Sequence, residues 1–196
     1  HRFAGQSIKE FGLGCSSHVV EIASNDGTLL KCFHDRGIRS TGIEPTTRAA
    51  AIARNSGLET IEVFLTLESA DVLIATGIEA DLLVANNVLA HVPNLNDFIK
   101  GLKILLKPEG VATIEFPSLM KLIEQNQFDT IYHEHFSYFS LLTVEKIFSH
   151  HGLFLFDVDE LNTHGGSLRI YVKHQENSQN PTSKNLSHVK LMEKNK

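Results

Sequence analysis

Four consecutive residues, Tyr132, His133, Glu134 and His135, form the densest group of chemically competent side chains in the sequence, and Tyr138 follows closely. Imidazole titrates near neutral pH, so a histidine in this group could accept a proton as a general base. A neighbouring carboxylate can orient the imidazole and stabilise its cation. A tyrosine hydroxyl can donate a hydrogen bond to a substrate oxygen. The group therefore holds a base, an orienting group and a donor, which together favour acid–base chemistry.

Two other interpretations of this histidine-rich segment stay open. In an extended chain His133 and His135 share one face, and with His91 and His164 they could assemble a metal site. Metal ligands are more often four residues apart on a helix, as in HExxH, so we expect no metal ion here. The segment could also be a buried loop whose polar groups the protein itself satisfies. Residues 164–166 (HGG) are either a second loop at the site or a turn before the last strand.

A second group of polar residues lies in the first quarter of the chain, in the stretch EIASNDG from Glu21 to Gly27 and in Glu44 with Pro45. A tight turn of small residues lets backbone N–H groups approach a ligand. Glu44 could accept both hydroxyl protons of a ribose. The turn lacks the G-x-G-x-x-G pattern of dinucleotide sites and carries carboxylates, which disfavour a pyrophosphate. An adenosine-type ligand with a positive centre, such as S-adenosylmethionine (SAM), fits better, although a plain turn and a solvated strand end would show the same residues.

Two adjacent amides, Asn86 and Asn87, follow a strand-like apolar run and precede Val88 and His91. At the end of a strand such amides could bond the amino-acid part of a ligand or the edge of a ring. A turn that caps the following helix is the alternative.

Runs of strand length alternate with runs of helical period along most of the chain. This alternation predicts an α/β fold with a parallel sheet between two helical layers, and ligands at the carboxyl ends of the strands. The last two strands can pair as a hairpin, which would make one strand antiparallel. A break is expected at 108–110 (Pro-Glu-Gly), before the fifth strand. The expected strands are 18–23, 40–44, 59–65, 81–85, 111–116, 153–158 and 167–172, and the helices begin after 27 and cover 47–56, 95–105 and 141–148.

Composition excludes several classes of partner. The 196 residues hold 18 Lys+Arg against 23 Asp+Glu, a net charge of −5, so we expect no nucleic-acid partner. No apolar run approaches the roughly 18 residues of a membrane span.

Cys15 and Cys32 are expected as two buried free thiols of a cytoplasmic protein rather than as a disulfide. We divide the chain into a domain over 1–175 and a polar linker or tail over 176–196, with one short helix near its end.

From Val19 to Val172 the sequence resembles class I SAM-dependent methyltransferases, and most of all the C-methyltransferases of nucleotide-linked 4-keto deoxysugars. The resemblance implies a three-layer Rossmann-like fold whose seven-stranded, mostly parallel sheet has an antiparallel last strand. It implies methyl transfer from SAM to a carbon of the sugar through an enolate, with S-adenosylhomocysteine as product. The segments that carry it are EIASNDG (21–27), GIEP (42–45), ANNVLAHVPNLNDF (85–98), FDTIYHEHFSYFS (128–140) and HGGSLRIYV (164–172).

The resemblance also implies a cofactor site. Its family usually has glycine where this chain has Ala23, and the added methyl group would weaken SAM binding without forbidding it. The implied residues are Glu21, Ala23, Ser24, Asn25 and Gly27 at the methionine portion, Glu44 and Pro45 at the ribose, Phe64 on the adenine, and Asn86, Asn87 and Val88 on the other side of the cofactor.

For catalysis, the resemblance supports His135 as the base, with Glu134 as its orienting group or as an alternative base. Tyr132 would contact the substrate oxygen, and His91 would lie near the transferred methyl group. The expected partner is a small nucleotide-linked sugar. The sugar, the methylated carbon and the oligomeric state are not predicted.

Chains of the resembled family usually carry a zinc-binding segment before this domain and a substrate domain after it, and neither is in this sequence. We therefore expect a central domain that binds SAM but turns over sugar poorly on its own. Two other functions stay open: a class I methyltransferase acting on O or N of another small molecule, and a non-catalytic module that binds SAM or a nucleotide.

Overall fold

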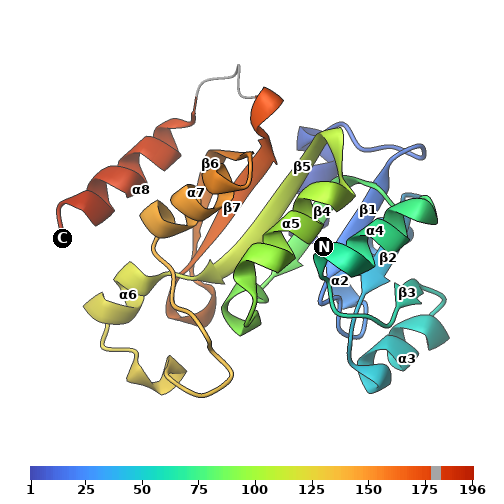
Figure 1. Cartoon of the computed structure of the whole chain (residues 1–196), viewed down its shortest axis with the longest axis horizontal. Helices are drawn as coiled ribbons and strands as arrows, with labels where there is room; N and C mark the ends of the chain where they lie inside the picture. The colour runs from blue at the N-terminus through green and yellow to red at the C-terminus, as the bar shows by residue number, and fades with distance from the viewer. Residues whose placement is uncertain (178–181) are drawn as a thin grey trace. The chain divides into compact units, whose positions relative to one another are not determined.

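The computed structural model describes residues 1–177 and 182–196. Within them, seven strands form one sheet in the order β3-β2-β1-β4-β5-β7-β6 (Figure 1). β1 pairs in parallel with β2 and β4, and β2 with β3, whereas β6 and β7 are antiparallel. The expected Rossmann-like α/β fold with an antiparallel last strand is thereby confirmed. The strands are β1 (His18–Ile22), β2 (Arg39–Ile43), β3 (Glu59–Ile61), β4 (Ala80–Asn86), β5 (Leu106–Pro117), β6 (Leu153–Leu161) and β7 (Ser167–His174).

Helices connect most of these strands. The chain divides into two compact units, residues 1–85 with 100–112 and residues 86–99 with 113–196, and each unit is described by itself. The α-helices are α1 (Arg2–Glu10), α2 (Thr28–His34), α3 (Thr47–Asn55), α4 (Leu67–Ala75), α5 (Leu95–Leu105), α6 (Leu119–Glu124), α7 (Leu141–His150) and α8 (Lys184–Lys194). Short 3-10 turns are η1 (Leu89–His91), η2 (Phe128–Thr130), η3 (Thr163–Gly165) and η4 (Gln175–Asn177).

The first unit is built on β1, all five residues of which are buried. Burial on both faces is what an inner parallel strand between helices requires. One core cluster joins β1 and β4 to α1 and α2, with the rings of Phe3 and Phe33 in edge contact at 6.4 Å. No strand or helix was expected before residue 18, and α1 supplies the buried Ala4 to this cluster.

The largest differences from the expected strand boundaries are in β3 and β5. β3 ends at Ile61 rather than at residue 65, because β2, its partner, has paired its last residue, Ile43, with Ile61. β5 runs through 108–110, where a break was expected. A Cβ atom on Gly110 would lie 2.6 Å from the Ala80 carbonyl oxygen, so this glycine allows the backbone of β5 to approach Ala80 of β4 closely.

The second unit contains the hairpin of β6 and β7, whose register shifts between Leu155 and Asp157. α7 and α8 contact β6 and each other, as their orange and red ribbons show (Figure 1). α8 lies within the segment expected as a polar linker or tail, and it buries Leu186 and Val189. Residues 178–181 of that segment lie outside the described part of the chain.

The two cysteines are free; Cys32 is buried, but Cys15 is exposed, so the expected burial of both thiols is wrong for Cys15. None of the helices in the described ranges is both long and apolar enough to cross a membrane.

Candidate active site

The turn that follows β1 holds its residues in unusual backbone conformations. Ala23, Asn25 and Gly27 all have positive φ, at 54°, 53° and 80°. Gly27 has a φ that favours glycine, and a Cβ atom there would lie 2.3 Å from Leu58 Cδ1, so any other residue would be strained and would displace the Leu58 side chain. The turn is also tied to the neighbouring strand, because the Ala23 N–H donates to the Ile43 carbonyl at 2.8 Å.

Glu44 binds this turn from the end of β2. Its Oε2 accepts a hydrogen bond from the Asn25 N–H at 2.9 Å, and its Oε1 accepts one from the Thr46 N–H at 2.8 Å. A carboxylate has about four acceptor positions, so two remain for the hydroxyl groups of a ligand. Pro45 directly follows, half-buried. The fold of the first unit therefore brings Glu44 into hydrogen-bond contact with the turn after β1, the segment with which the sequence analysis had grouped it.

Glu21 is the buried acid of this turn. Its Oε2 lacks a hydrogen-bond partner among the described residues, and so does the buried hydroxyl of Ser24. Burial raises the pKa of Glu21 to about 8, the Leu30 backbone N–H opposes the shift, and the charges of Asp26 and Glu44 add to it. A buried acceptor without a partner is unfavourable unless a ligand supplies the donor.

These groups fit SAM. Its ammonium group and ribose hydroxyls are donors, and its positive charge would favour the ionised form of Glu21 and so oppose the rise in the pKa of that acid. The chain would hold it with Glu21 and Ser24 at the methionine portion and Glu44 at the ribose. The Phe64 side chain is 74% exposed and free to cover an adenine.

In the second unit, Asn86 is the last residue of β4, and Asn87 and Val88 follow it. The Asn87 N–H donates to the Glu115 carbonyl at 2.8 Å, which holds Asn87 at a φ of 53°. The side-chain oxygens of Asn86 and Asn87 are buried and make no hydrogen bond within the described ranges. Both amides therefore have acceptors available for a ligand.

The imidazole group of the second unit gathers around His135. Its Nδ1 lies 2.8 Å from the Thr130 carbonyl oxygen and its Nε2 lies 3.2 Å from the Tyr132 hydroxyl. A carbonyl oxygen only accepts, so Nδ1 carries the proton, and Nε2 of the neutral ring is an acceptor. The Tyr138 hydroxyl also donates to the Thr130 carbonyl, at 3.4 Å.

His91 joins this group from η1. Its ring centroid lies 4.7 Å from that of His135, and its Nδ1 lies 3.1 Å from the backbone oxygen of Glu134. Glu134 thus orients His91 through its backbone, whereas the Thr130 carbonyl takes the orienting position at His135 that was expected for the Glu134 side chain. His133 is exposed, with its ring 6.4 Å from that of Tyr132.

Sequence reasoning missed a hydrogen-bond network in the second unit that is centred on Glu115. Glu115 is buried in β5 and accepts hydrogen bonds from Arg169 at 2.6 Å and from Thr163 at 2.9 Å. It thereby ties the HGG turn at 164–166 to the strand whose backbone holds Asn87. In residues 1–177 and 182–196, no three His, Cys, Asp or Glu side chains lie close enough to hold a metal ion.

Known proteins match the chain over most of its length. The family model described as a methyltransferase domain matches residues 1–158. The chain is 37% identical over 164 residues to the protein named C-methyltransferase NovU from Streptomyces niveus, which covers 84% of this chain and 39% of that relative. It therefore spans about two fifths of the length of this curated relative.

Solved structures agree on the fold. A SAM-dependent methyltransferase from Anabaena variabilis has a TM-score of 0.70 at 15% identity, covering 88% of this chain and 83% of that one. Magnesium protoporphyrin IX methyltransferase from Synechocystis, solved with bound S-adenosylhomocysteine, has a TM-score of 0.66 at 12% identity, covering 87% and 80%. With the family model covering residues 1–158, the chain belongs to the methyltransferase domain family, and it shares the fold of these SAM-dependent methyltransferases.

Proposed function

We propose that this domain methylates a carbon of a nucleotide-linked keto-deoxysugar through an enolate. The observation that carries the proposal is the fixed tautomer of His135, which leaves Nε2 as a proton acceptor beside the Tyr132 hydroxyl. A C–H next to a ketone is acidic enough for enzymatic removal only when a base and a donor to the ketone oxygen act together. The relative named a C-methyltransferase supports the choice of carbon as the acceptor.

Each residue of the group has a part in this reaction. His135 Nε2 takes the proton from the carbon next to the ketone, and the electron pair of that C–H bond becomes the enolate. Tyr132 donates to the ketone oxygen, where the negative charge collects. His91 Nδ1 donates to the Glu134 carbonyl, so Nε2 of the neutral His91 ring is an acceptor. It is a second polar group near the new bond. When bound, SAM supplies the electrophilic methyl group that the enolate carbon attacks.

The test separates proton removal from methyl transfer. The chain is incubated in D2O with a thymidine-diphosphate-linked 4-keto-6-deoxyhexose, without SAM, and deuterium at the carbons next to the ketone is measured by NMR. Exchange needs only the base and the donor, and long incubation detects it even when turnover is slow. His135→Gln should lower the exchange rate by about a hundredfold or more, with S-adenosylhomocysteine binding unchanged.

His133→Gln is the matched control, because His133 is exposed and has no part in the proposed reaction. With SAM added, the product should gain one methyl group on carbon. Equal exchange rates in the original chain and in His135→Gln would refute His135 as the base. A methyl group found on O or N instead would refute the enolate.

A further inference from the structure

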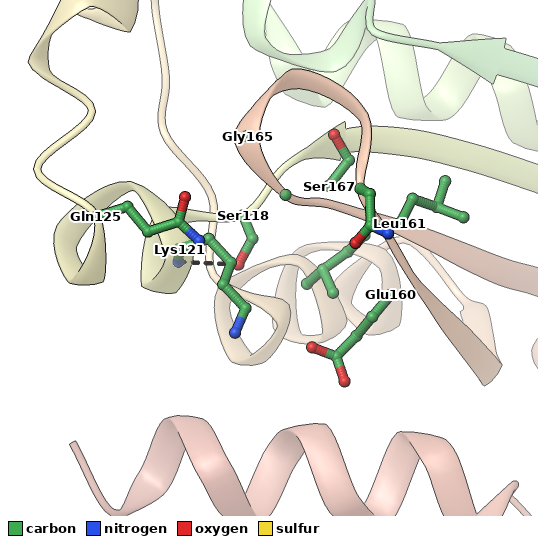
Figure 2. A pocket seen from close by; sticks show the side chains of 10 residues that line it. Ser118, Lys121, Gln125, Glu160, Leu161, Gly165 and Ser167 are labelled. Carbon is green, nitrogen blue, oxygen red and sulfur yellow. Dashed lines mark hydrogen bonds between the residues drawn. The ribbon is translucent and has the colours of Figure 1, made fainter.

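A hollow of about 400 Å³ lies in the second unit, between α6 and the turn that joins β6 to β7 (Figure 2). It is large enough for a small-molecule ligand. Polar groups dominate its lining, which includes Ser118, Lys121, Gln125, Glu160, Asn162 and Ser167.

The turn that forms one wall is held in place by hydrogen bonds from two other segments. Gln127 Nε2 donates to the Gly165 carbonyl at 2.7 Å, and the Ser118 N–H donates to the Gly166 carbonyl at 3.0 Å. Gly166 has a φ of 119°, and a Cβ atom there would lie 2.8 Å from Lys121 Cγ. The glycine therefore leaves the Lys121 side chain its position at the hollow.

Several polar groups at the hollow have bonding capacity to spare. Within the part of the chain that the structure describes, the side chains of Glu160 and Asn162 form no hydrogen bond. Among residues 1–177 and 182–196, the Lys121 amine contacts only Glu124, at 3.3 Å. Lys121 and Glu160 extend in the same direction in Figure 2, so a cation and an anion face the same space.

This lining selects a class of ligand. A phosphate would be repelled by Glu160, and Lys121, the cation in the lining of the hollow, is already paired with Glu124. An organic cation would be repelled by Lys121. A neutral ligand rich in hydroxyl groups suits both, since each hydroxyl donates to the carboxylate or accepts from the amine and amides. Leu161 and Leu168 add an apolar area for the C–H face of a ring. We propose that this hollow binds a neutral hydroxylated ring.

The hollow is distinct from the base. α6 presents Lys121 to the hollow, and Gln125 directly after the helix lines it too, whereas Leu119 and Leu122 of α6 line a separate cavity with His135. The inference rests on the proposed function in one respect: the ring would be a part of the nucleotide-linked substrate remote from the reacting carbon. A pyranose and the ribose of a nucleoside share the required chemistry.

Amide NMR spectra of the chain, titrated with methyl α-D-glucopyranoside and separately with uridine, test the site. Peaks of Gly165, Gly166 and Gln125 should shift with a dissociation constant on the order of millimolar, as expected for a single ring. Glu160→Ala and Asn162→Ala should each weaken binding by about tenfold. Glu109→Ala, which removes an exposed carboxylate of the first unit, should leave it unchanged.

The two probes distinguish the sources of the ring. Shifts with the pyranoside assign a sugar, and shifts with uridine alone assign a ribose. Absence of shifts at about 50 mM of both probes, or equal affinities in Glu160→Ala and the original chain, would overturn the inference. S-adenosylhomocysteine binding and deuterium exchange, measured on the same sample, report on the proposed function independently.

Discussion

Ala23 holds a backbone conformation that L-residues rarely adopt, with a φ of 54° in the turn after β1. The left-handed region brings Cβ close to the backbone, at a cost of roughly 1–2 kcal/mol. Two hydrogen bonds to the Ile43 carbonyl, from the N–H groups of Ala23 and Ser24, keep the turn in this form. The surrounding contacts therefore hold a strained residue beside the expected cofactor.

Ala23→Gly should raise the free energy of unfolding by about 0.5–1 kcal/mol, because relief of strain exceeds the added freedom of the unfolded chain. Urea unfolding measures this. Removal of the methyl group should also tighten S-adenosylhomocysteine binding in a calorimetric titration. Ala51→Gly in α3 is the control and should lose about 1 kcal/mol. A destabilised Ala23→Gly would show that the methyl group packs favourably instead.

Sequence reasoning reached the acids of the first unit but not the orienting group of His135. Glu21 lies near the end of β1 and Glu44 directly follows β2, and the carboxyl ends of neighbouring parallel strands meet at one edge of a sheet. Residue type and the predicted parallel strands therefore sufficed to group the two acids at that edge. The Thr130 carbonyl is a backbone group that every residue possesses, so no residue type marks it. Its place depends on how the loop 128–135 folds.

At the scale of elements, α8 is bound to the second unit by charged contacts as well as by its apolar face. Glu193 accepts hydrogen bonds from the N–H groups of Leu141 and Leu142, at 2.7 and 2.9 Å, at the start of α7. Lys190 pairs with Glu145 at 2.6 Å, and Lys196 pairs with Glu124. The carboxylate of Glu193 thus satisfies two N–H groups that a helix start leaves unpaired.

Glu193→Gln should lower the free energy of unfolding by about 1 kcal/mol, because it loses the charge and one of the two acceptors. Glu193→Ala should lose about 2 kcal/mol. Urea unfolding followed by circular dichroism measures both. Glu109→Gln, at an exposed site of the first unit, should change little. Equal stability of all three variants would mean that water replaces the carboxylate at no cost.

The seven strands were predictable, but helix α1 and the lengths of several strands, above all β3 and β5, were not. β1 is marked in the sequence by Val19, Val20 and Ile22, all of them buried. The extent of β3 depends on where its partner ends, and the extent of β5 on the close approach of Gly110 to Ala80. A glycine after a proline ordinarily indicates a turn. Only the position of Ala80 in the folded protein shows that Gly110 serves close packing of the backbone.

For the molecule as a whole, two buried groups make stability depend on pH in opposite directions. His18 Nε2 lies 2.7 Å from the Thr41 hydroxyl, and because that hydroxyl donates to Glu59 at 2.6 Å, Nε2 is the donor to Thr41. Burial, with the charge of Arg39, lowers the pKa of His18 to about 4, against the charge of Glu59. Burial raises the pKa of Glu21 to about 8.

The unfolded chain binds the His18 proton below pH 6.5, so this group's contribution is complete above pH 6.5 and is lost as pH falls to about 4. Folded Glu21 keeps its proton above pH 4.5, so its contribution is complete below pH 4.5 and is lost as pH rises through about 8. At about 1.4 kcal/mol per pKa unit, these shifts amount to roughly 3 kcal/mol for His18 and roughly 5 kcal/mol for Glu21. The two slopes oppose each other from pH 4.5 to 6.5, where stability should be greatest.

Urea unfolding between pH 4 and 8.5 tests this, because each variant should expose the other slope. Glu21→Gln should remove the loss of stability on the alkaline side and leave a rise from pH 4 to 6.5. His18→Gln should remove the loss on the acid side and leave a fall from pH 4.5 to 8. Parallel pH profiles for the two variants and the original chain would contradict both assignments.

The backbone partner of His135 has a consequence for how protons could leave the site. Nδ1 is committed to the Thr130 carbonyl, which is not an acceptor that can carry a proton onward. In the proposed reaction, a proton gained at Nε2 can depart only from Nε2, on the side where the substrate binds. The His135 ring therefore cannot pass the proton through to a second acceptor at Nδ1. In each cycle the product must leave before Nε2 can lose the proton and act as a base again.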